Sequence, residues 1–202
     1  MYENIELSKK RAYELFDKKV IDTFEIGTFK GLQQIHAYMF QDVFDFAGQL
    51  RTVDLTKGNF RFAPIRFLKS NLEIIEKMPE ITFDNIVDKY VEMNVAHPFR
   101  EGNGRSTRIW LDLILKKNLN VCIDWSKIDK DDYLSAMERS PVNSLEIKTL
   151  LKNSITNDVH NREVYMKGVL RSYEYEGYYE KLSELEKYDK ANLIEEDKDL
   201  EI

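Results

Sequence analysis

The chain has 202 residues, of which 43% are hydrophobic and 33% charged, and its formal net charge is −6. This composition predicts one globular domain, and the acidic balance gives no support for a nucleic-acid-binding surface. The single cysteine, Cys122, excludes an internal disulfide, and no apolar run is long enough to span a bilayer. We therefore expect a cytoplasmic protein that contacts neither nucleic acid nor membrane directly.

Apolar residues recur at helical spacing along most of the chain. The pattern predicts helices over residues 3–18, 28–40, 83–96, 105–119, 131–138 and 143–151, and a further one from Pro64 to about Met78. One segment departs from this pattern. Residues 51–62 alternate apolar and polar around Lys57-Gly58-Asn59, which is typical of a small β-hairpin. The expected fold is all-α, a helical bundle with the hairpin lying on it.

The helix predicted over residues 105–119 is apolar almost all round. A helix of this kind is usually central and buried. It follows the most informative run of the chain, His97-Pro98-Phe99-Arg100-Glu101-Gly102-Asn103-Gly104-Arg105-Ser106-Thr107-Arg108. The two glycines permit positive φ, so the turn can form a phosphate-binding nest at a helix N-terminus. Arg105 and Arg108 share a helix face and can hold further phosphate oxygens as forks.

His97 ends one predicted helix and opens this turn, where a general base would be useful. His97 and Glu101 also have a spacing that suits zinc, but no third ligand is evident. Oxygen ligation of Mg²⁺ by Glu101 beside substrate phosphates fits better. His36 and His160 are expected to be ordinary core or surface residues. Asn94 extends an apolar stripe toward His97, and either a helix-capping contact or a nucleotide contact would satisfy it.

The twelve-residue run resembles the Fic-family signature His-Pro-Phe-x-(Asp/Glu)-Gly-Asn-Gly-Arg-x-x-Arg at every fixed position. The resemblance implies a Fic fold and an enzyme that moves AMP from ATP to a hydroxyl group of a protein. It implies that His97 is the base and that Glu101 binds Mg²⁺. Gly102, Asn103, Gly104 and Arg105 would hold the transferring phosphate, and Arg108 the γ-phosphate. Asn94 and Asn143 are expected to contact the ribose or the adenine.

In Fic proteins a hairpin, the flap, occupies the place of residues 51–62. The family resemblance implies that it holds the target segment by β-strand addition. It also implies that Lys57 and Phe60 lie over the nucleotide. The other interpretation of these two residues is a solvated turn lysine and a hydrophobic plug.

The run Ser172-Tyr173-Glu174-Tyr175-Glu176-Gly177 resembles the Fic inhibitory motif (Ser/Thr)-x-x-x-Glu-(Gly/Asn). Ser172 and Glu176 share one helix face. The resemblance implies an inhibitory helix over about residues 161–178, with Glu176 paired to Arg108 in the room of the γ-phosphate. Alternatively, Glu176 simply ends a surface helix before Gly177. Tyr173 or Tyr175 is a candidate self-modification site if the helix swings out, and plain packing is the other interpretation.

We expect a single domain over residues 1–180, then a charged tail over 181–202 that is frayed or disordered. Several functions stay open beside adenylyl transfer from ATP. They are transfer from another donor such as UTP or CDP-choline, kinase activity, hydrolytic removal of AMP, and regulatory ATP binding without transfer. The layout resembles short bacterial Fic toxins that modify type II DNA topoisomerases, which suggests a target class. A homo-oligomer also stays open.

Overall fold

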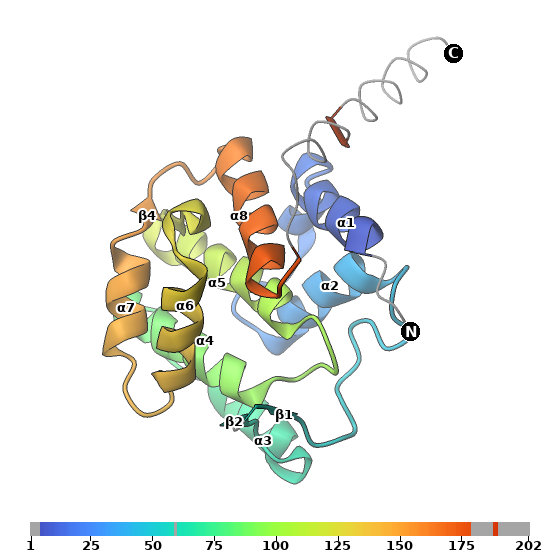
Figure 1. The fold of residues 1–202 in the computed structure, drawn as a ribbon, viewed down its shortest axis with the longest axis vertical. Helices are drawn as coiled ribbons and strands as arrows, with labels where there is room; N and C mark the ends of the chain where they lie inside the picture. Colours follow the sequence, from blue (N-terminus) through green and yellow to red (C-terminus); the bar gives the residue numbers. More distant parts are fainter. Residues whose placement is uncertain (1–4, 59, 179–187, 190–202) are drawn as a thin grey trace.

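A computed structural model describes residues 5–58, 60–178 and 188–189 of the chain (Figure 1). The expected tail, residues 181–202, therefore lies outside the described residues except at 188 and 189. The helices are α1 Ile5–Asp17, α2 Phe29–Phe40, α3 Ile65–Glu76, α4 Phe83–Ala96, α5 Asn103–Leu119, α6 Lys130–Arg139, α7 Leu145–Lys152 and α8 Arg162–Tyr175. Short 3-10 turns lie at Val20–Thr23 and Trp125–Lys127. The mostly helical fold expected from the apolar spacing is confirmed.

Helix α5 is the centre of the molecule. It packs against α4, α2 and α8, which surround it in Figure 1. Trp110 on α5 is fully buried, and its Nε1–H donates to the carbonyl of Thr28 at 3.0 Å, where α2 begins. The prediction of a buried central helix is confirmed. A helix held on several sides is a rigid support for groups at its N-terminus.

Side-chain caps explain why several helices begin where they do. The hydroxyl of Thr28 accepts the N–H of Gly31 at the start of α2, and the hydroxyl of Thr82 accepts that of Asn85 at the start of α4. Asn161 caps α8 in the same way through its side-chain oxygen. Each cap satisfies an N–H that the first turn of a helix leaves without a partner.

The hairpin is smaller than the sequence predicts. The strands β1, Thr56–Lys57, and β2, Phe60–Arg61, pair with Thr56 opposite Arg61 and Lys57 opposite Phe60, and the N–H of Phe62 donates to the carbonyl of Leu55 at 3.2 Å beside them. The rest of residues 51–62 is held by other bonds, described below. This segment keeps the name flap.

A second strand pair was not predicted. β3, Cys122–Ile123, pairs antiparallel with β4, Ile155–Thr156, and so ties the end of α5 to the segment before α8. Strands of two residues have no periodicity that a sequence pattern can reveal. No helix in the described part of the chain is long and apolar enough to cross a membrane.

Candidate active site

The site is built where α4 ends and α5 begins. His97 is the C-cap of α4 and adopts a left-handed conformation, with φ 49° and ψ 62°. Gly102 is the N-cap of α5, with φ 80°. A Cβ on Gly102 would lie 2.6 Å from the ring of Phe40, so glycine is required there for conformation and for space. The loop between His97 and Gly102 thus turns tightly and brings both ends to the start of α5.

Two buried side chains hold this loop in shape. The amide of Asn103 accepts the N–H of Phe99 at 2.9 Å and donates to the carbonyl of Phe99 at 2.8 Å. Nδ1 of His36 accepts the N–H of Gly48 at 2.8 Å, and its Nε2 lies 2.8 Å from the carbonyl of Glu101. Because a carbonyl only accepts, Nε2 carries the proton. Burial lowers the pKa of His36 to about 4, so the ring is neutral.

These bonds refine two expectations from the sequence. His36 is a core histidine, as expected, but it also fastens the signature loop, which its isolated position in the sequence does not reveal. The side chain of Asn103 is committed to Phe99, so a nucleotide contact by this residue is left to its backbone N–H. That contact stays a prediction.

The expectation that Gly104 needs a positive φ is wrong. Gly104 lies within α5, and its backbone is helical. What glycine provides here is space for two neighbouring side chains. A Cβ there would lie 2.7 Å from Oε1 of Glu176 and 3.2 Å from both terminal nitrogens of Arg108. The sequence spacing could not reveal this reason, since Glu176 lies on another helix.

The two signature arginines have different surroundings. The guanidinium of Arg105 is buried between the rings of Phe40 and Tyr173, at 4.9 and 5.0 Å from their centroids. Its Nη2 lies 3.3 Å from Oε1 of Glu101. Arg105 therefore packs between α2 and α8 and reaches the signature loop at its edge. A phosphate contact by Arg105 stays a prediction.

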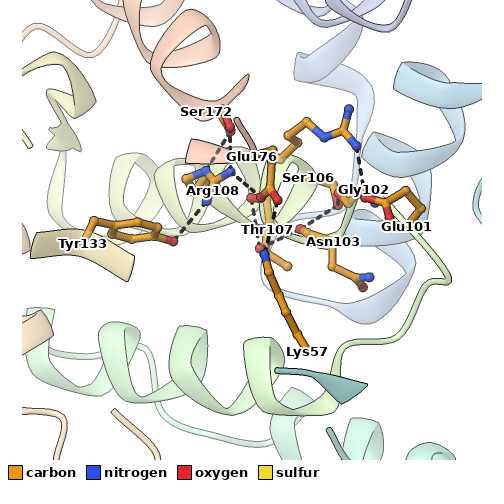
Figure 2. A network of polar contacts seen from close by, with 12 residues as sticks. Lys57, Glu101, Gly102, Asn103, Ser106, Thr107, Arg108, Tyr133, Ser172 and Glu176 are labelled. Atoms are coloured by element: carbon orange, nitrogen blue, oxygen red, sulfur yellow. Dashed lines mark hydrogen bonds and ion pairs between the residues drawn. The ribbon is translucent and has the colours of Figure 1, made fainter. Parts of the chain in front are cut away.

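Arg108 is the centre of a polar network that joins α5 to α6 and α8, which Figure 2 shows from close by. Its Nε donates to Oγ of Ser172 at 2.7 Å, and its Nη2 donates to the carbonyl of Ser172 at 3.0 Å. Nη1 donates to the hydroxyl of Tyr133 at 3.2 Å. Tyr133 in turn lies 2.5 Å from the hydroxyl of Tyr90. Tyr133 on α6, bonded in turn to Tyr90 on α4, therefore holds Nη1 of Arg108.

Glu176 completes this network at the end of α8. Its Oε1 lies 3.4 Å from Nη2 of Arg108 and its Oε2 lies 3.6 Å from Nζ of Lys57 (Figure 2). Burial alone would raise the pKa of Glu176, but Arg108 and then Lys57 and Arg105 outweigh it and lower the pKa. The pairing of Glu176 with Arg108 expected from the sequence is present. The interpretation of Glu176 as a mere end of a surface helix is wrong.

The ring of His97 is stacked on Phe62, with centroids 3.6 Å apart and planes 19° from parallel. Its Nδ1 lies 3.4 Å from the backbone carbonyl of Asn94, which can only accept, so Nδ1 carries the proton. Nε2 then has a free lone pair, as a base requires. Burial is the main cause that lowers the pKa of His97 to about 4. Asn94 acts on His97 through its backbone, and its predicted nucleotide contact stays a prediction.

The remaining candidates lie as follows. The side chain of Lys57 is 69% exposed, and its Nζ lies 3.6 Å from Oε2 of Glu176. Phe60 is half-buried, with its ring 5.1 Å from that of Phe62. Asn143 is exposed, and its side-chain oxygen accepts the N–H of Leu145 at the start of α7. The nucleotide contacts expected for Lys57, Phe60 and Asn143 stay predictions.

Tyr173 and Tyr175 are packing residues in this conformation. Both are buried, the hydroxyl of Tyr173 donates to Oγ of Ser8, and that of Tyr175 donates to the carbonyl of Ile128. Neither hydroxyl is accessible for modification unless α8 leaves. Gly177 follows α8 with φ 92°, a conformation that favours glycine as a helix stop.

Besides Phe62, two residues of the site were not predicted from the sequence. Tyr133 lies on α6, where a tyrosine among apolar residues indicates only packing. Arg51 begins the flap, where its place in the alternation indicates a solvent-facing strand residue. It is instead almost fully buried, and it donates to the carbonyl of His97 at 2.8 Å. A single sequence contains no signal that distinguishes such an arginine from an exposed one.

Comparison with known proteins identifies the domain. The model of the Fic/DOC family matches residues 28–115. Protein adenylyltransferase VbhT of Bartonella schoenbuchensis is 30% identical over 168 residues, which are 76% of this chain and 34% of that protein. This chain thus spans about a third of the length of VbhT. A probable protein adenylyltransferase Fic of Escherichia coli is 26% identical over 77% of this chain and 84% of its own length.

Solved structures agree on the fold. The N-terminal Fic domain of Bep8 from a Bartonella species superposes with a TM-score of 0.64 at 14% identity, over 75% of this chain and 84% of that one. BepC of Bartonella tribocorum, solved with bound AMPPNP, superposes with a TM-score of 0.60 at 20% identity, over 74% of this chain and 86% of that one. The expected Fic fold is confirmed.

Proposed function

This chain is a Fic-domain protein, and we propose that it is an autoinhibited protein adenylyltransferase that moves AMP from ATP to a hydroxyl side chain of a target protein. The proposal rests on the observation that the groups needed for this reaction lie close together. The base His97, the Gly102 turn at the start of α5, and Arg108 with its partner Glu176 meet between α4 and α8. Relatives named protein adenylyltransferases match about three quarters of this chain, which supports the same chemistry.

In the proposed reaction the hydroxyl oxygen of the target attacks the α-phosphorus of ATP. The bond from that phosphorus to the oxygen shared with the β-phosphate breaks, and pyrophosphate leaves. The hydroxyl proton passes to Nε2 of His97, while the Nδ1–H stays directed at the carbonyl of Asn94. The free N–H groups and the positive dipole end of α5 stabilise the charge on the transferring phosphate. Positioning and electrostatics thus account for most of the catalysis.

The residues present suit a Mg²⁺ ion held mainly by substrate. Glu101 is 55% exposed beside the phosphate turn, and its Oε1 accepts the N–H of Gly102 at 3.0 Å. Among the residues placed by the structure, no group of three or more His, Cys, Asp or Glu side chains is arranged to hold a metal. Mg²⁺ usually takes one or two carboxylates together with substrate phosphates. When bound, the ion would neutralise phosphate charge, and Glu101 is the residue to hold it.

Inhibition is proposed to act through Arg108. The γ-phosphate of a productively bound ATP would need the guanidinium face that Glu176 now contacts at 3.4 Å. A carboxylate and a phosphate compete for the same fork because both accept its N–H groups. Ser172 strengthens the block because both of its oxygens are bonded to Arg108. ATP can therefore bind productively only when the end of α8 moves away.

The target is proposed to dock at the flap. Each strand of the β1–β2 pair has an outer edge, and an extended segment of the target can add to it as a third strand. By analogy with short bacterial relatives of this layout, type II DNA topoisomerases are the first target class to test.

The decisive experiment is label transfer. The Glu176→Gly variant is incubated with cell lysate and with ATP labelled at the α- or the γ-phosphate, and with α-labelled UTP. Adenylyl transfer predicts protein bands that carry only the α-label of ATP and that disappear in Glu176→Gly/His97→Ala. Bands with γ-label would indicate a kinase, bands with label from UTP another donor, and no band would leave only nucleotide binding.

A further inference from the structure

The end of α4 is capped by the flap, by Ala63 directly after it and by His97 itself. Carbonyl groups at a helix C-terminus lack helical partners and need others. Five successive carbonyls, from Asn94 to Pro98, all accept hydrogen bonds. The carbonyl of Asn94 accepts from Nδ1 of His97 at 3.4 Å, and that of Val95 accepts from the N–H of Ala63 at 3.0 Å. Arg51 donates to the other three: its Nη2 to Ala96 at 3.2 Å, its Nε to His97 at 2.8 Å, and its N–H to Pro98 at 2.8 Å. The flap is therefore fastened to α4 at both of its ends.

Arg51 supplies most of these bonds. Its side chain is 2% exposed, and it also donates to the carbonyl of Val53 at 2.6 Å and to that of Ala63. In the part of the chain that the structure places, no carboxylate forms an ion pair with Arg51. A buried guanidinium without an anion is costly, and the negative end of the α4 dipole offsets part of that cost. Such a cation is well suited to fix the backbone at the end of this helix.

His97 needs this support because its backbone is strained. A left-handed conformation costs a residue other than glycine about 1–2 kcal/mol. It persists only where the surroundings determine it. Arg51 binds the carbonyl of His97 at 2.8 Å, and Phe62, at the other end of the flap, stacks on its ring at 3.6 Å. The backbone and the ring of His97 are thus each fixed by one residue of the flap segment.

We propose that Arg51 and Phe62 are positioning residues for the base, and that flap and base form one rigid unit. The inference rests on the proposed role of His97 as the base. A target strand that pairs with the flap would then be placed in register with the atom that takes its proton. Register of this kind matters because a displacement of about 1 Å at the reacting groups can cost about 100-fold in rate.

Phe62→Leu tests the stacking while keeping an apolar side chain in place. The chain has 3 histidines, so the ring resonances of His97 can be assigned in NMR spectra by comparison with His97→Ala. In the Glu176→Gly background we expect a downfield shift of the His97 ring resonance, because the ring current of Phe62 is lost. We also expect kcat to fall by about tenfold or more with little change in KM for ATP. Phe67→Leu, on the exposed face of α3, is the matched control and should change neither.

Arg51→Met and Arg51→Lys test the backbone clamp through the titration of His97. The charged groups that face His97 are Arg51 and Lys57 from the flap and Glu176 from α8. Loss of the Arg51 charge should move the pKa of His97, and the acid limb of kcat, to higher pH. Arg51→Lys keeps the positive charge, so the pKa of His97 should rise less than in Arg51→Met. The NMR titration needs no turnover, so it tests the coupling of Arg51 to His97 even if no AMP transfer is found.

Two results would overturn the proposal. One is a folded Phe62→Leu variant whose His97 resonance and kcat match the parent. The other is a folded Arg51→Met variant in which His97 titrates as before. If Arg51→Met does not fold, the Phe62→Leu measurements alone decide.

Discussion

Gly104 in α5 and Glu176 at the C-cap of α8 are so close that a side chain at position 104 would have to displace the Glu176 carboxylate. A Cβ on Gly104 would lie 2.7 Å from Oε1 of Glu176, well inside van der Waals contact. The phosphate turn and the end of α8 are therefore fitted to each other at the same spot where Glu176 meets Arg108. This fit makes a prediction that does not depend on any activity.

Gly104→Ala should cost the parent less than the about 1–3 kcal/mol usual for overpacking, because the clashing atom ends a flexible side chain and alanine favours the helix. In the Glu176→Gly background the cost should be smaller by at least about 0.5 kcal/mol, because the nearest atom is gone. Urea unfolding of the four proteins of the cycle measures this coupling. Gly168→Ala is the control. Gly168 lies within α8, away from Glu176, and faces the side chain of Trp125, so the effect of this substitution on the free energy of unfolding should add to that of Glu176→Gly. Additivity at Gly104 as well would mean that the turn and α8 are not in contact.

His97→Ala in the Glu176→Gly background should lower AMP transfer by about 10²- to 10⁴-fold, the usual effect of losing a general base. ATP affinity, measured by calorimetry, should stay within a few-fold, because Arg108 and the N-terminus of α5 are unchanged. Transfer at the parental rate would remove His97 from the mechanism.

Glu101→Gln should weaken Mg²⁺-dependent transfer, because the amide keeps the shape of the side chain and loses its charge. Higher Mg²⁺ should restore part of the rate, since phosphates supply the other ligands. Titration of the rate against Mg²⁺ gives the shift in the half-saturating concentration. Undiminished transfer by either protein in the presence of a chelator would exclude the metal.

Acidification should destabilise the fold through His36. The pKa of this residue is lowered from 6.5 to about 4 by burial, so between these values the unfolded chain binds a proton that the folded chain does not. The stabilisation of the fold by neutral, buried His36 is fully present above about pH 6.5 and is lost as the pH falls toward 4. Between pH 7 and 5 the loss should be roughly 1–2 kcal/mol in the free energy of unfolding. His97, shifted to the same value, acts in the same direction.

The matched variant for this test is His36→Gln, which removes the titrating group. Urea unfolding at pH 7 and pH 5 should show a smaller difference between the two pH values for this variant than for the parent. An equal difference would show that His36 does not cause the pH dependence.

The sequence could predict those elements whose signals are local. The apolar stripe and the Thr82 cap begin α4, and the His97-Pro98 step ends it, so its predicted bounds of 83–96 agree with the structure. The pairing of Glu176 with Arg108 could be predicted because both belong to recognisable motifs. The clamp of Arg51 and the strand pair β3–β4 could not, because their partners are distant backbone groups that leave no pattern in the sequence.

The central claim is that Glu176 restrains transfer by occupying Arg108, and transfer of α-labelled AMP by four proteins tests it. We expect Glu176→Gly to exceed the parent, and Glu176→Gly/Arg108→Ala to lose that gain, because the gain depends on Arg108. Glu174→Gly is the control, since it removes the same charge from the same helix, where the carboxylate pairs with Arg171 and not with Arg108. It should stay at the parental level. A Glu176→Gly protein that is folded by circular dichroism and transfers no more AMP than the parent would contradict the claim.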